Sequence, residues 1–258
     1  MSHQEDWAQA LSEWAIPQKI LDKAQTSPWI HPPVLFQIPD EINESVSHER
    51  AREALTPGGT VLDVGCGGGI AAFALTPPAS HVIGVDHQPE MLEMFKENAK
   101  KHQVTCEVFE GFWPHVAPLV PVADVVVSHH VVYNVADISP FLRELGSHAR
   151  SRVVIEMPRQ HPLTNMSAAW KHFWNLERPI RPTSEDLVEV LNEIGIKAHV
   201  QNWAGQMRDR VDIDQDAEFM RIRLCLPPER LQEVREYVLA NPLPRQREIA
   251  TIWWDVTA

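Results

Sequence analysis

Short apolar runs alternate with amphipathic segments along most of this chain. Seven runs have the length and composition of strands, and they cover residues 60–64, 81–86, 104–109, 123 onward, 152–157, 196–203 and 248–256. Segments with apolar residues at helical spacing lie between them, at 70–75, 89–99, 138–148, 183–194 and in two runs within 213–240. This alternation predicts an α/β fold built on a doubly wound sheet.

The most informative motif joins the first strand to the next helix. Residues 60–69 read Thr-Val-Leu-Asp-Val-Gly-Cys-Gly-Gly-Gly, so the strand is apolar apart from Asp63. The glycines at 65 and 67–69 let the chain turn sharply and let its backbone approach a ligand closely. A helix beginning at Ile70 would point its first amides at that ligand. The motif therefore predicts a nucleotide-cofactor turn.

Two classes of cofactor use such a turn. The dinucleotide fingerprint G-x-G-x-x-G/A can be matched to residues 67–72, which keeps an NAD-dependent oxidoreductase as an alternative. Asp63 has no role in that frame, whereas a carboxylate beside the loop suits the ammonium group of S-adenosylmethionine (SAM). Asp86 ends the second strand, where its oxygens can accept from both hydroxyls of a ribose. Because both cofactors contain a ribose, Asp86 does not separate them.

The order of these pieces resembles that of the class I SAM-dependent methyltransferases over about residues 55–157. Residues 60–69 are similar to the family's first motif, and Asp86 to its ribose-binding acid. Residues 123–133 resemble its fourth strand and following loop, and residues 152–157 resemble its fifth strand. The resemblance implies a Rossmann-like, seven-stranded, mostly parallel sheet with helices on both faces and a helical substrate cap. It also implies SAM as the cofactor and S-adenosylhomocysteine as its product.

The resemblance implies cofactor contacts from the turn, from the ends of the next two strands and from the loop after the fourth. These residues are Asp63, Gly65, Gly67, Gly69, Asp86, His87, Gly111, Phe112, Trp113, Ser128 and His129. The family often carries Gly-Asp after the third strand, with the acid on the adenine amine, but residues 110–113 read Glu-Gly-Phe-Trp. Phe112 or Trp113 can stack on the adenine, while Glu110 or a main-chain carbonyl accepts from the amine. Alternatively, both rings only pack beneath the loop.

Length and composition fit a single methyltransferase domain over residues 1–258. The chain has 258 residues, of which 44% are hydrophobic, and no second domain is required. We expect an N-terminal helical lid (1–50), a SAM-binding core (51–157) and a C-terminal half that carries cap helices and the last strands (158–258). His31 falls within the expected lid.

The cysteines and the first residues bear on the compartment. Cys66, Cys106 and Cys225 are too few and too scattered for a disulfide framework or a zinc cluster, which favours a reducing compartment. The N-terminal residues lack the pattern of a signal peptide, and no apolar run approaches the roughly 20 residues that span a bilayer. We expect a cytoplasmic protein without a membrane partner.

The charge of the chain limits its partners. The formal net charge is −12 at pH 7, which disfavours nucleic acid because phosphate binding requires clustered Lys and Arg. The basic residues within 143–152 and 221–230 are interleaved with acids or lie at helical spacing, as on a solvated helix face. We therefore expect a small-molecule substrate, and the protein itself as a monomer or homodimer.

Tryptophan is unusually frequent, with nine Trp against two Tyr. Trp7 and Trp14 lie on one helical stripe, and Trp170 and Trp174 on another. Large apolar rings suit walls that surround a ligand and exclude water, so Trp14, Trp170 and Trp174 are candidates for substrate contact. The alternative for each is ordinary packing.

The loop after the fourth strand lies where the methyl group would emerge, and it spans residues 128–134. His129 and His130 titrate near neutral pH, so either can act as a base if the acceptor must lose a proton. Tyr133 is a third catalytic candidate, and Asn134 with Tyr133 can orient an acceptor. Successive side chains of a strand point to opposite sides, which predicts that one histidine faces the pocket. The alternative is that both histidines only bond to the backbone.

The absence of a metal-ligand pattern and the position of Glu156 complete the prediction of the reaction. Adjacent histidines are poorly spaced for a metal and no Cys or carboxylate pair completes a site, so we expect no catalytic metal. Glu156 ends the fifth strand and reaches either the pocket or the surface. We predict methyl transfer from SAM to an oxygen, nitrogen or carbon atom of a small molecule. A SAM-binding module without turnover and an NAD-dependent oxidoreductase are the alternatives.

Overall fold

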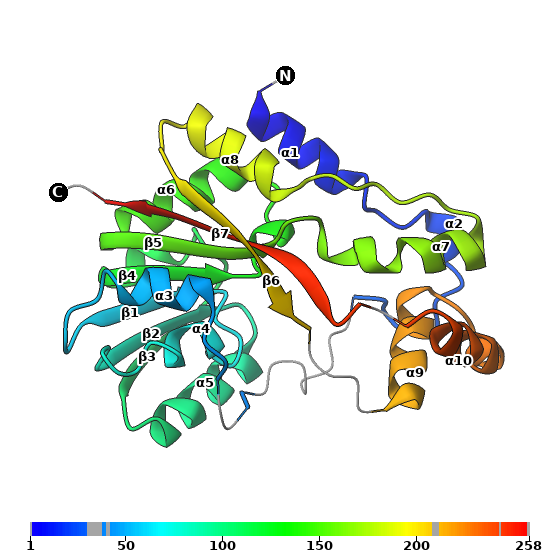
Figure 1. The fold of residues 1–258 in the computed structure, drawn as a ribbon, viewed down its shortest axis with the longest axis horizontal. Coiled ribbons are helices and arrows are strands. Elements are labelled where there is room, and N and C mark those ends of the chain that lie inside the picture. The colour runs from blue at the N-terminus through cyan, green and yellow to red at the C-terminus, as the bar shows by residue number, and fades with distance from the viewer. Residues whose placement is uncertain (1, 30–37, 40–41, 208–211, 243, 257–258) are drawn as a thin grey trace.

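The computed structural model describes residues 2–29, 38–39, 42–207, 212–242 and 244–256, and within them the chain forms one seven-stranded sheet (Figure 1). The strands are β1 (Thr60–Val64), β2 (His81–Asp86), β3 (Thr105–Glu110), β4 (Ala123–His129), β5 (Ala149–Pro158), β6 (His199–Gln206) and β7 (Gln246–Asp255). Their order in the sheet is β3-β2-β1-β4-β5-β7-β6.

The direction of the strands defines the fold class. Strands β1 to β5 are parallel, and β7 lies antiparallel between β5 and β6. The direction of strand addition reverses between β1 and β4, and in such sheets ligands bind beyond the carboxyl ends of the strands at this point. The prediction of a Rossmann-like, mostly parallel, seven-stranded α/β fold is confirmed.

Helices cover both faces of the sheet, α3, α4 and α5 on one face and α1, α6 and α8 on the other. The other helices, α2, α7, α9 and α10, lie beyond the carboxyl ends of the parallel strands and are called the cap below (Figure 1). The helices are α1 (His3–Ser12), α2 (Gln18–Leu21), α3 (Val46–Arg52), α4 (Ile70–Phe73), α5 (Pro89–Lys101), α6 (Ile138–Ser147), α7 (Ser167–Trp174), α8 (Ser184–Glu193), α9 (Ile213–Arg223) and α10 (Leu231–Ala240).

Burial on both faces explains the continuous apolar runs of the central strands. In β1, Val61 packs toward α4 and α5 while Leu62 packs toward α6, and neither is exposed to solvent. A parallel strand covered by helices on both sides needs apolar residues at consecutive positions. The cap has an apolar cluster of its own, which includes Ile20, Trp170 and Met220.

Strand β6 begins at His199, three residues later than the apolar pattern predicts. Gly195 adopts the left-handed conformation that ends α8, with φ +85°, and the Ile196 amide donates to the carbonyl of Leu191 at 2.8 Å. Ile196 packs against the core from this helix end. Its apolar character therefore reflects packing and not strand pairing.

The two helices of the N-terminal segment pack in different parts of the protein. Trp7 in α1 is buried in the core, and its indole N–H donates to the carbonyl of Val135 at 2.8 Å. Helix α1 packs on α8 and α6, so this part of the expected lid covers a helical layer, whereas α2 joins the cap. His31 lies outside the described residues.

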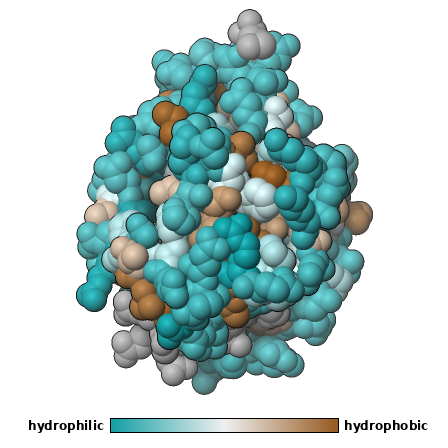
Figure 2. Space-filling view, turned by 90° about the vertical axis from the view of Figure 1, so that its right-hand side faces the viewer, coloured by the Kyte–Doolittle hydropathy of each residue, from teal (hydrophilic) through white to brown (hydrophobic). Residues whose placement is uncertain are grey.

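The cap side of the molecule is largely hydrophilic, with small and scattered apolar patches (Figure 2). Among the described residues, no helix is both long and apolar enough to cross a membrane.

Candidate active site

The carboxyl ends of β1, β2, β4 and β5 meet at the edge of the sheet that faces the cap (Figure 1). The register places His129 of β4 beside Glu156 of β5, and Glu156 beside Thr251 of β7. Paired residues of neighbouring strands point to the same face, so these three side chains form a row on the face covered by α3. Most of the predicted site residues lie along this edge.

The turn after β1 has a backbone conformation that requires glycine at several positions. Gly65, Gly67 and Gly69 have φ of +74°, +51° and +93°, in the left-handed region that side chains disfavour. A Cβ on Gly65 would lie 2.4 Å from Cγ2 of Val131, and one on Gly69 would lie 2.3 Å from the ring of Phe73. The turn therefore brings its backbone close to the surrounding elements without side chains of its own.

Three polar side chains hold this turn in place. The Gly67 amide donates to Oδ2 of Asp86 at 3.0 Å, and the amide of Asn98 in α5 donates to the carbonyl of Gly68 at 3.0 Å. Asp63 accepts from the amide of Ala72 in α4 at 3.3 Å. Two neighbouring elements and the turn's own helix thus determine its shape.

Asp63 lies beneath the turn and not on its open side. It is 1% exposed, and burial raises the pKa of its carboxyl to about 7, against the opposing effect of the Ala72 amide. Near neutral pH the carboxyl is therefore partly protonated. A contact with the SAM ammonium, expected from the sequence, remains a prediction; the structure places Asp63 as a support of the turn.

The ends of β2 and β3 carry an exposed pair of rings. His87 and Phe112 stack with centroids 4.6 Å apart and planes at 21°, and Phe112 is 65% exposed. Trp113 lies in the core, where its indole N–H donates to the carbonyl of Phe141 at 3.3 Å. Of the two rings considered for the adenine, only Phe112 presents a surface at this edge. Trp113 packs beneath the loop, as in the alternative stated for it, and its contact with the cofactor stays a prediction.

Both predicted histidines lie near one carboxylate. His129 ends β4, stacks on His48 of α3 with centroids 5.6 Å apart, and has a buried Nε2 without a partner among the described residues. Burial lowers the pKa of His129 to about 3, so the ring is neutral at pH 7. His130 has φ +63°, which breaks the strand alternation, and its Nε2 lies 3.0 Å from Oε1 of Glu156. Both rings therefore lie near Glu156, but only the His130 ring is largely exposed, and the expectation that one histidine faces the pocket stays a prediction.

Glu156 is a buried carboxylate held by several donors. Besides His130, the hydroxyl of Ser45, the N-cap of α3, donates to its Oε2 at 3.1 Å. Burial alone would raise the pKa of Glu156, but the charges of His129 and His130 and the Ser47 hydroxyl hold it well below its usual range. Because His129 is neutral at pH 7, the His130 ring and the hydroxyl groups maintain the ionised carboxylate there.

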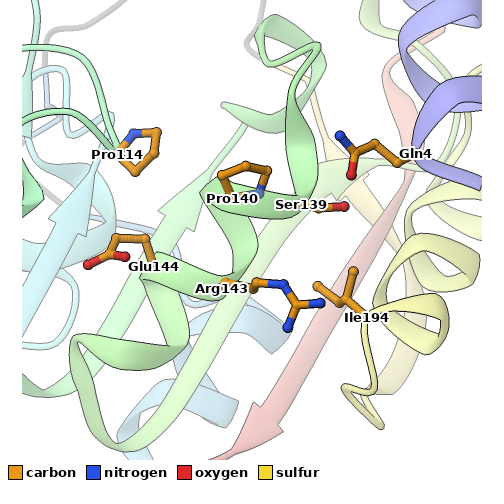
Figure 3. A pocket seen from close by; sticks show the side chains of 7 residues that line it. All are labelled: Gln4, Pro114, Ser139, Pro140, Arg143, Glu144 and Ile194. Carbon is orange, nitrogen blue, oxygen red and sulfur yellow. The ribbon is translucent and has the colours of Figure 1, made fainter.

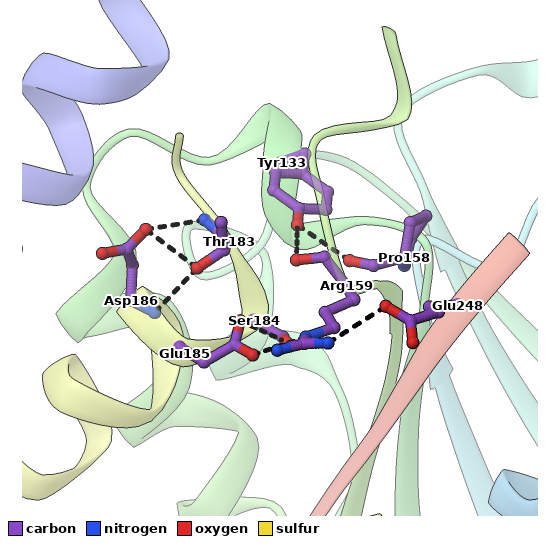
Figure 4. Close-up of polar contacts among 8 residues, drawn as sticks. All are labelled: Tyr133, Pro158, Arg159, Thr183, Ser184, Glu185, Asp186 and Glu248. Carbon is purple, nitrogen blue, oxygen red and sulfur yellow. Dashed lines mark hydrogen bonds and ion pairs between the residues drawn. The ribbon is translucent and has the colours of Figure 1, made fainter. Parts of the chain in front are cut away.

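Tyr133 has a structural role, which disfavours the prediction that it is a catalytic base. Its hydroxyl donates to the carbonyl of Pro158 at 2.8 Å (Figure 4), and its ring stacks on Trp7 with centroids 5.8 Å apart. Burial, with the charges of Glu185 and Asp186, raises its pKa above the usual value. A neutral phenol that already donates to the backbone cannot serve as a base near pH 7.

The three candidate Trp residues pack within the protein. Trp14 is 4% exposed and stacks on His161 with centroids 4.0 Å apart. Trp170 is buried in the cap, and the indole N–H of Trp174 donates to the carbonyl of Leu224 at 2.7 Å. The structure supports the alternative of packing for all three, and their contact with substrate stays a prediction.

The remaining two candidates differ in exposure. Ser128 is fully buried, and its hydroxyl donates to the carbonyl of Val64 at 3.0 Å, which ties β4 to β1. Asn134 is exposed in the short helical turn after β4. It remains available to a ligand from solvent.

Two surface hollows lie away from this edge. One has a volume of about 470 Å³ between α1, α6 and α8 (Figure 3) and is lined by Gln4, Pro114, Ser139, Pro140, Arg143, Glu144 and Ile194. The other, of about 330 Å³, lies between α5 and β3. Neither includes the glycine turn or the His130–Glu156 pair, so the site is assigned from its chemistry.

Several residues of this edge were not predicted. Ser45, Ser47 and His48 come from α3, and Thr251 from β7, where its hydroxyl bonds to that of Ser47 at 2.7 Å. Their sequence signal is limited to Ser45-x-x-His48, the spacing of a capping box. No group of three metal-ligand side chains suited to an ion is found in the part of the chain that the structure describes.

A family model described as a methyltransferase domain matches residues 55–208, more than half of the chain. The chain therefore belongs to this methyltransferase family, and the predicted class of SAM-dependent methyltransferase is confirmed.

Individual relatives match shorter stretches. A ribosomal protein L11 methyltransferase from Vibrio campbellii is 36% identical over 89 residues, which are 34% of this chain and 30% of the relative. A ubiquinone biosynthesis O-methyltransferase from Azorhizobium caulinodans is 29% identical over 117 residues, 45% of this chain and 46% of the relative. The chain thus spans less than half the length of these curated relatives.

Solved structures share the fold. A putative methyltransferase from Bacillus halodurans C-125 superposes with a TM-score of 0.54 at 15% identity and covers 82% of this chain and 97% of that one. The YcgJ protein from Bacillus subtilis gives 0.53 at 16% identity, with 82% and 98% covered. At these identities the likeness shows the fold alone.

SAM is the cofactor of this family, and the edge of the sheet fits it. The turn offers backbone without side chains, and Asp86 beside it is 8% exposed with oxygens that accept from the amides of Gly67 and Gln88. A carboxylate oxygen can accept more than one hydrogen bond, so Asp86 can still accept from ribose hydroxyls.

Asp86→Ala is expected to weaken SAM binding by about 1–3 kcal/mol, or roughly 5- to 150-fold in Kd, because charge-assisted bonds to the ribose are lost. The bond that holds Gly67 is lost as well. Titration calorimetry with SAM measures the change. Glu107→Ala, an exposed acid on β3, is the matched control. An unchanged affinity in Asp86→Ala would remove this residue from the cofactor site.

Proposed function

We propose that this protein transfers the methyl group of SAM to a proton-bearing atom of a small-molecule acceptor, with His130 as the general base. The observation that carries the proposal is the 3.0 Å contact between Nε2 of His130 and Oε1 of Glu156 at the edge that faces the cap. A base whose other nitrogen is oriented by a buried carboxylate is a recurrent arrangement for proton abstraction.

SAM, His130 and Glu156 have different roles in the proposed reaction. SAM supplies a methyl group on a positively charged sulfur, so the donor is already reactive. With Nε2–H donating to Glu156, Nδ1 of His130 carries the lone pair that accepts the acceptor's proton. The ionised Glu156 then stabilises the imidazolium that forms. The turn and the strand ends contribute alignment, worth roughly 7–11 kcal/mol when the geometry is close to attack.

Two features support a small acceptor over a macromolecule. The cap, with α2 and α7 among its helices, lies over the edge that carries His130 (Figure 1). The net charge of −12 opposes binding to nucleic acid. The similarity to ribosomal protein L11 methyltransferases makes a protein acceptor the second candidate, although it covers only 34% of this chain.

Binding and labelling test this proposal in turn. Calorimetry is expected to show binding of SAM and none of NAD; the reverse would favour the oxidoreductase. The protein is then incubated with methyl-labelled SAM and either a metabolite extract or a ribosomal protein fraction. Label is expected in a small product, identified by mass spectrometry. Label in protein alone would establish the second candidate, and SAM binding without label in either would favour a binding module.

A further inference from the structure

Arg247, near the carboxylate of the site, has no ion-pair partner among the residues that the structure describes. Arg247 lies in β7, four residues before Thr251 and therefore on the same sheet face as Thr251 and Glu156. The pairing of β7 with β5 continues to Ile249, opposite Pro158, so Arg247 lies just beyond the carboxyl end of β5. This position is at the edge that faces the cap.

The carboxylates around Arg247 are bound to other groups. Arg159 pairs with Glu185 at 2.6 Å and with Glu248 at 3.0 Å (Figure 4). Glu156 is bonded to His130 and Ser45. Among the described residues, no carboxylate lies within ion-pair distance of the Arg247 guanidinium.

Arg247 is only partly exposed, which makes an unpaired charge costly. Burial lowers the pKa of its guanidinium, while the charge of Glu156 and that of Tyr133 act in the opposite direction. Of these two, Glu156 is the group ionised near pH 7, so its field reaches the guanidinium without a direct pair. A ligand anion would satisfy the guanidinium, which presents a planar fork of donors suited to a carboxylate.

We infer that the methyl acceptor carries an anionic group, a carboxylate in the simplest case, which the guanidinium of Arg247 binds beside the His130–Glu156 pair. This inference rests on the proposed methyl transfer. Anchoring one end of a small molecule at β7 presents its other end to His130, while the negative charge of Glu156 disfavours an acceptor that is anionic at the reacting atom itself. Arg247 would then be a specificity residue.

A fractionated extract tests this inference. Metabolites are separated at pH 7 on an anion exchanger into a retained, anionic fraction and a neutral or cationic flow-through, and each is incubated with methyl-labelled SAM and the protein. Label is expected from the retained fraction. Arg247→Gln should reduce that labelling about 10- to 100-fold, as expected for the loss of a charged hydrogen-bonded pair, and Arg247→Lys by less.

The controls separate this inference from the function on which it rests. SAM affinity should be unchanged in Arg247→Gln, and its thermal midpoint should be no lower than that of the wild type, because an unpaired charge is removed. Arg150→Gln, an exposed arginine paired with Asp124 at the start of β5, should label like the wild type. Label from the flow-through alone, or label from the retained fraction that Arg247→Gln leaves unchanged, would overturn the role of Arg247 while methyl transfer stands. Bound SAM with no label from any fraction would contradict methyl transfer itself, and this inference with it.

Discussion

His130→Gln is expected to lower turnover about 10²- to 10⁴-fold while the Kd for SAM stays unchanged, because proton abstraction by a positioned base contributes on this scale. Nε2 of His130 contacts Glu156 at 3.0 Å, and its side chain is 43% exposed, so a ligand can reach the ring. Gln keeps a hydrogen-bonding group but cannot accept a proton near neutral pH. Single-turnover rates with labelled SAM and the acceptor found by labelling measure the effect.

Three further variants make this result specific. Glu156→Gln should also lower turnover, since the imidazolium loses its carboxylate, but by less than His130→Gln. His129→Gln should change turnover little, because burial lowers the pKa of His129 to about 3 and makes its ring too weak a base to take up a proton near pH 7. His3→Gln, at the exposed first residue of α1, is the surface control. Equal turnover in His130→Gln and the wild type would show that His130 is not the base.

Asp63→Asn is expected to stabilise the protein, and by about 2–3 kcal/mol more at pH 8 than at pH 5. Burial raises the pKa of Asp63 from 3.8 to about 7 in the folded protein. Between these values the folded state binds more protons than the unfolded state, so the free energy of unfolding falls as pH rises and levels off above pH 7. Asn removes this dependence, and its side-chain oxygen can still accept from the amide of Ala72.

Urea unfolding of both proteins at the two pH values measures this difference. Asp22→Asn, an exposed carboxylate of the cap, should change stability equally at both. If Asp63 also binds the SAM ammonium, SAM affinity should increase as pH rises toward 7 and this increase should vanish in Asp63→Asn. A stability change in Asp63→Asn that does not depend on pH would show that this carboxyl is already ionised in the folded protein.

The sequence predicts the cofactor half of the site more closely than the acceptor half. Gly65, Gly67 and Gly69 have the left-handed backbone that their pattern implies, and Asp86 lies directly beside them. These residues are near one another in the sequence or end adjacent strands, so their meeting follows from the order of the elements. For Trp14 and Trp170 the sequence left packing and substrate contact equally open, because a helical stripe of rings looks the same whether it faces a ligand or a core, and both rings are buried.

By itself, the sequence determined the class of fold and the glycine turn, because hydrophobic periodicity and glycine conformation are local properties of the chain, while SAM as the cofactor followed from the family resemblance. Tertiary structure alone decided which groups surround Glu156. Ser45, about a hundred residues before Glu156 in the sequence, donates a hydrogen bond to its carboxylate. Arg247, about a hundred residues after it, lies close enough for the charge of Glu156 to oppose the lowering of its guanidinium pKa by burial. Tertiary structure also decided which histidine is open to a ligand. Nε2 of His129 is buried, whereas His130 has a left-handed backbone conformation and a side chain that is 43% exposed.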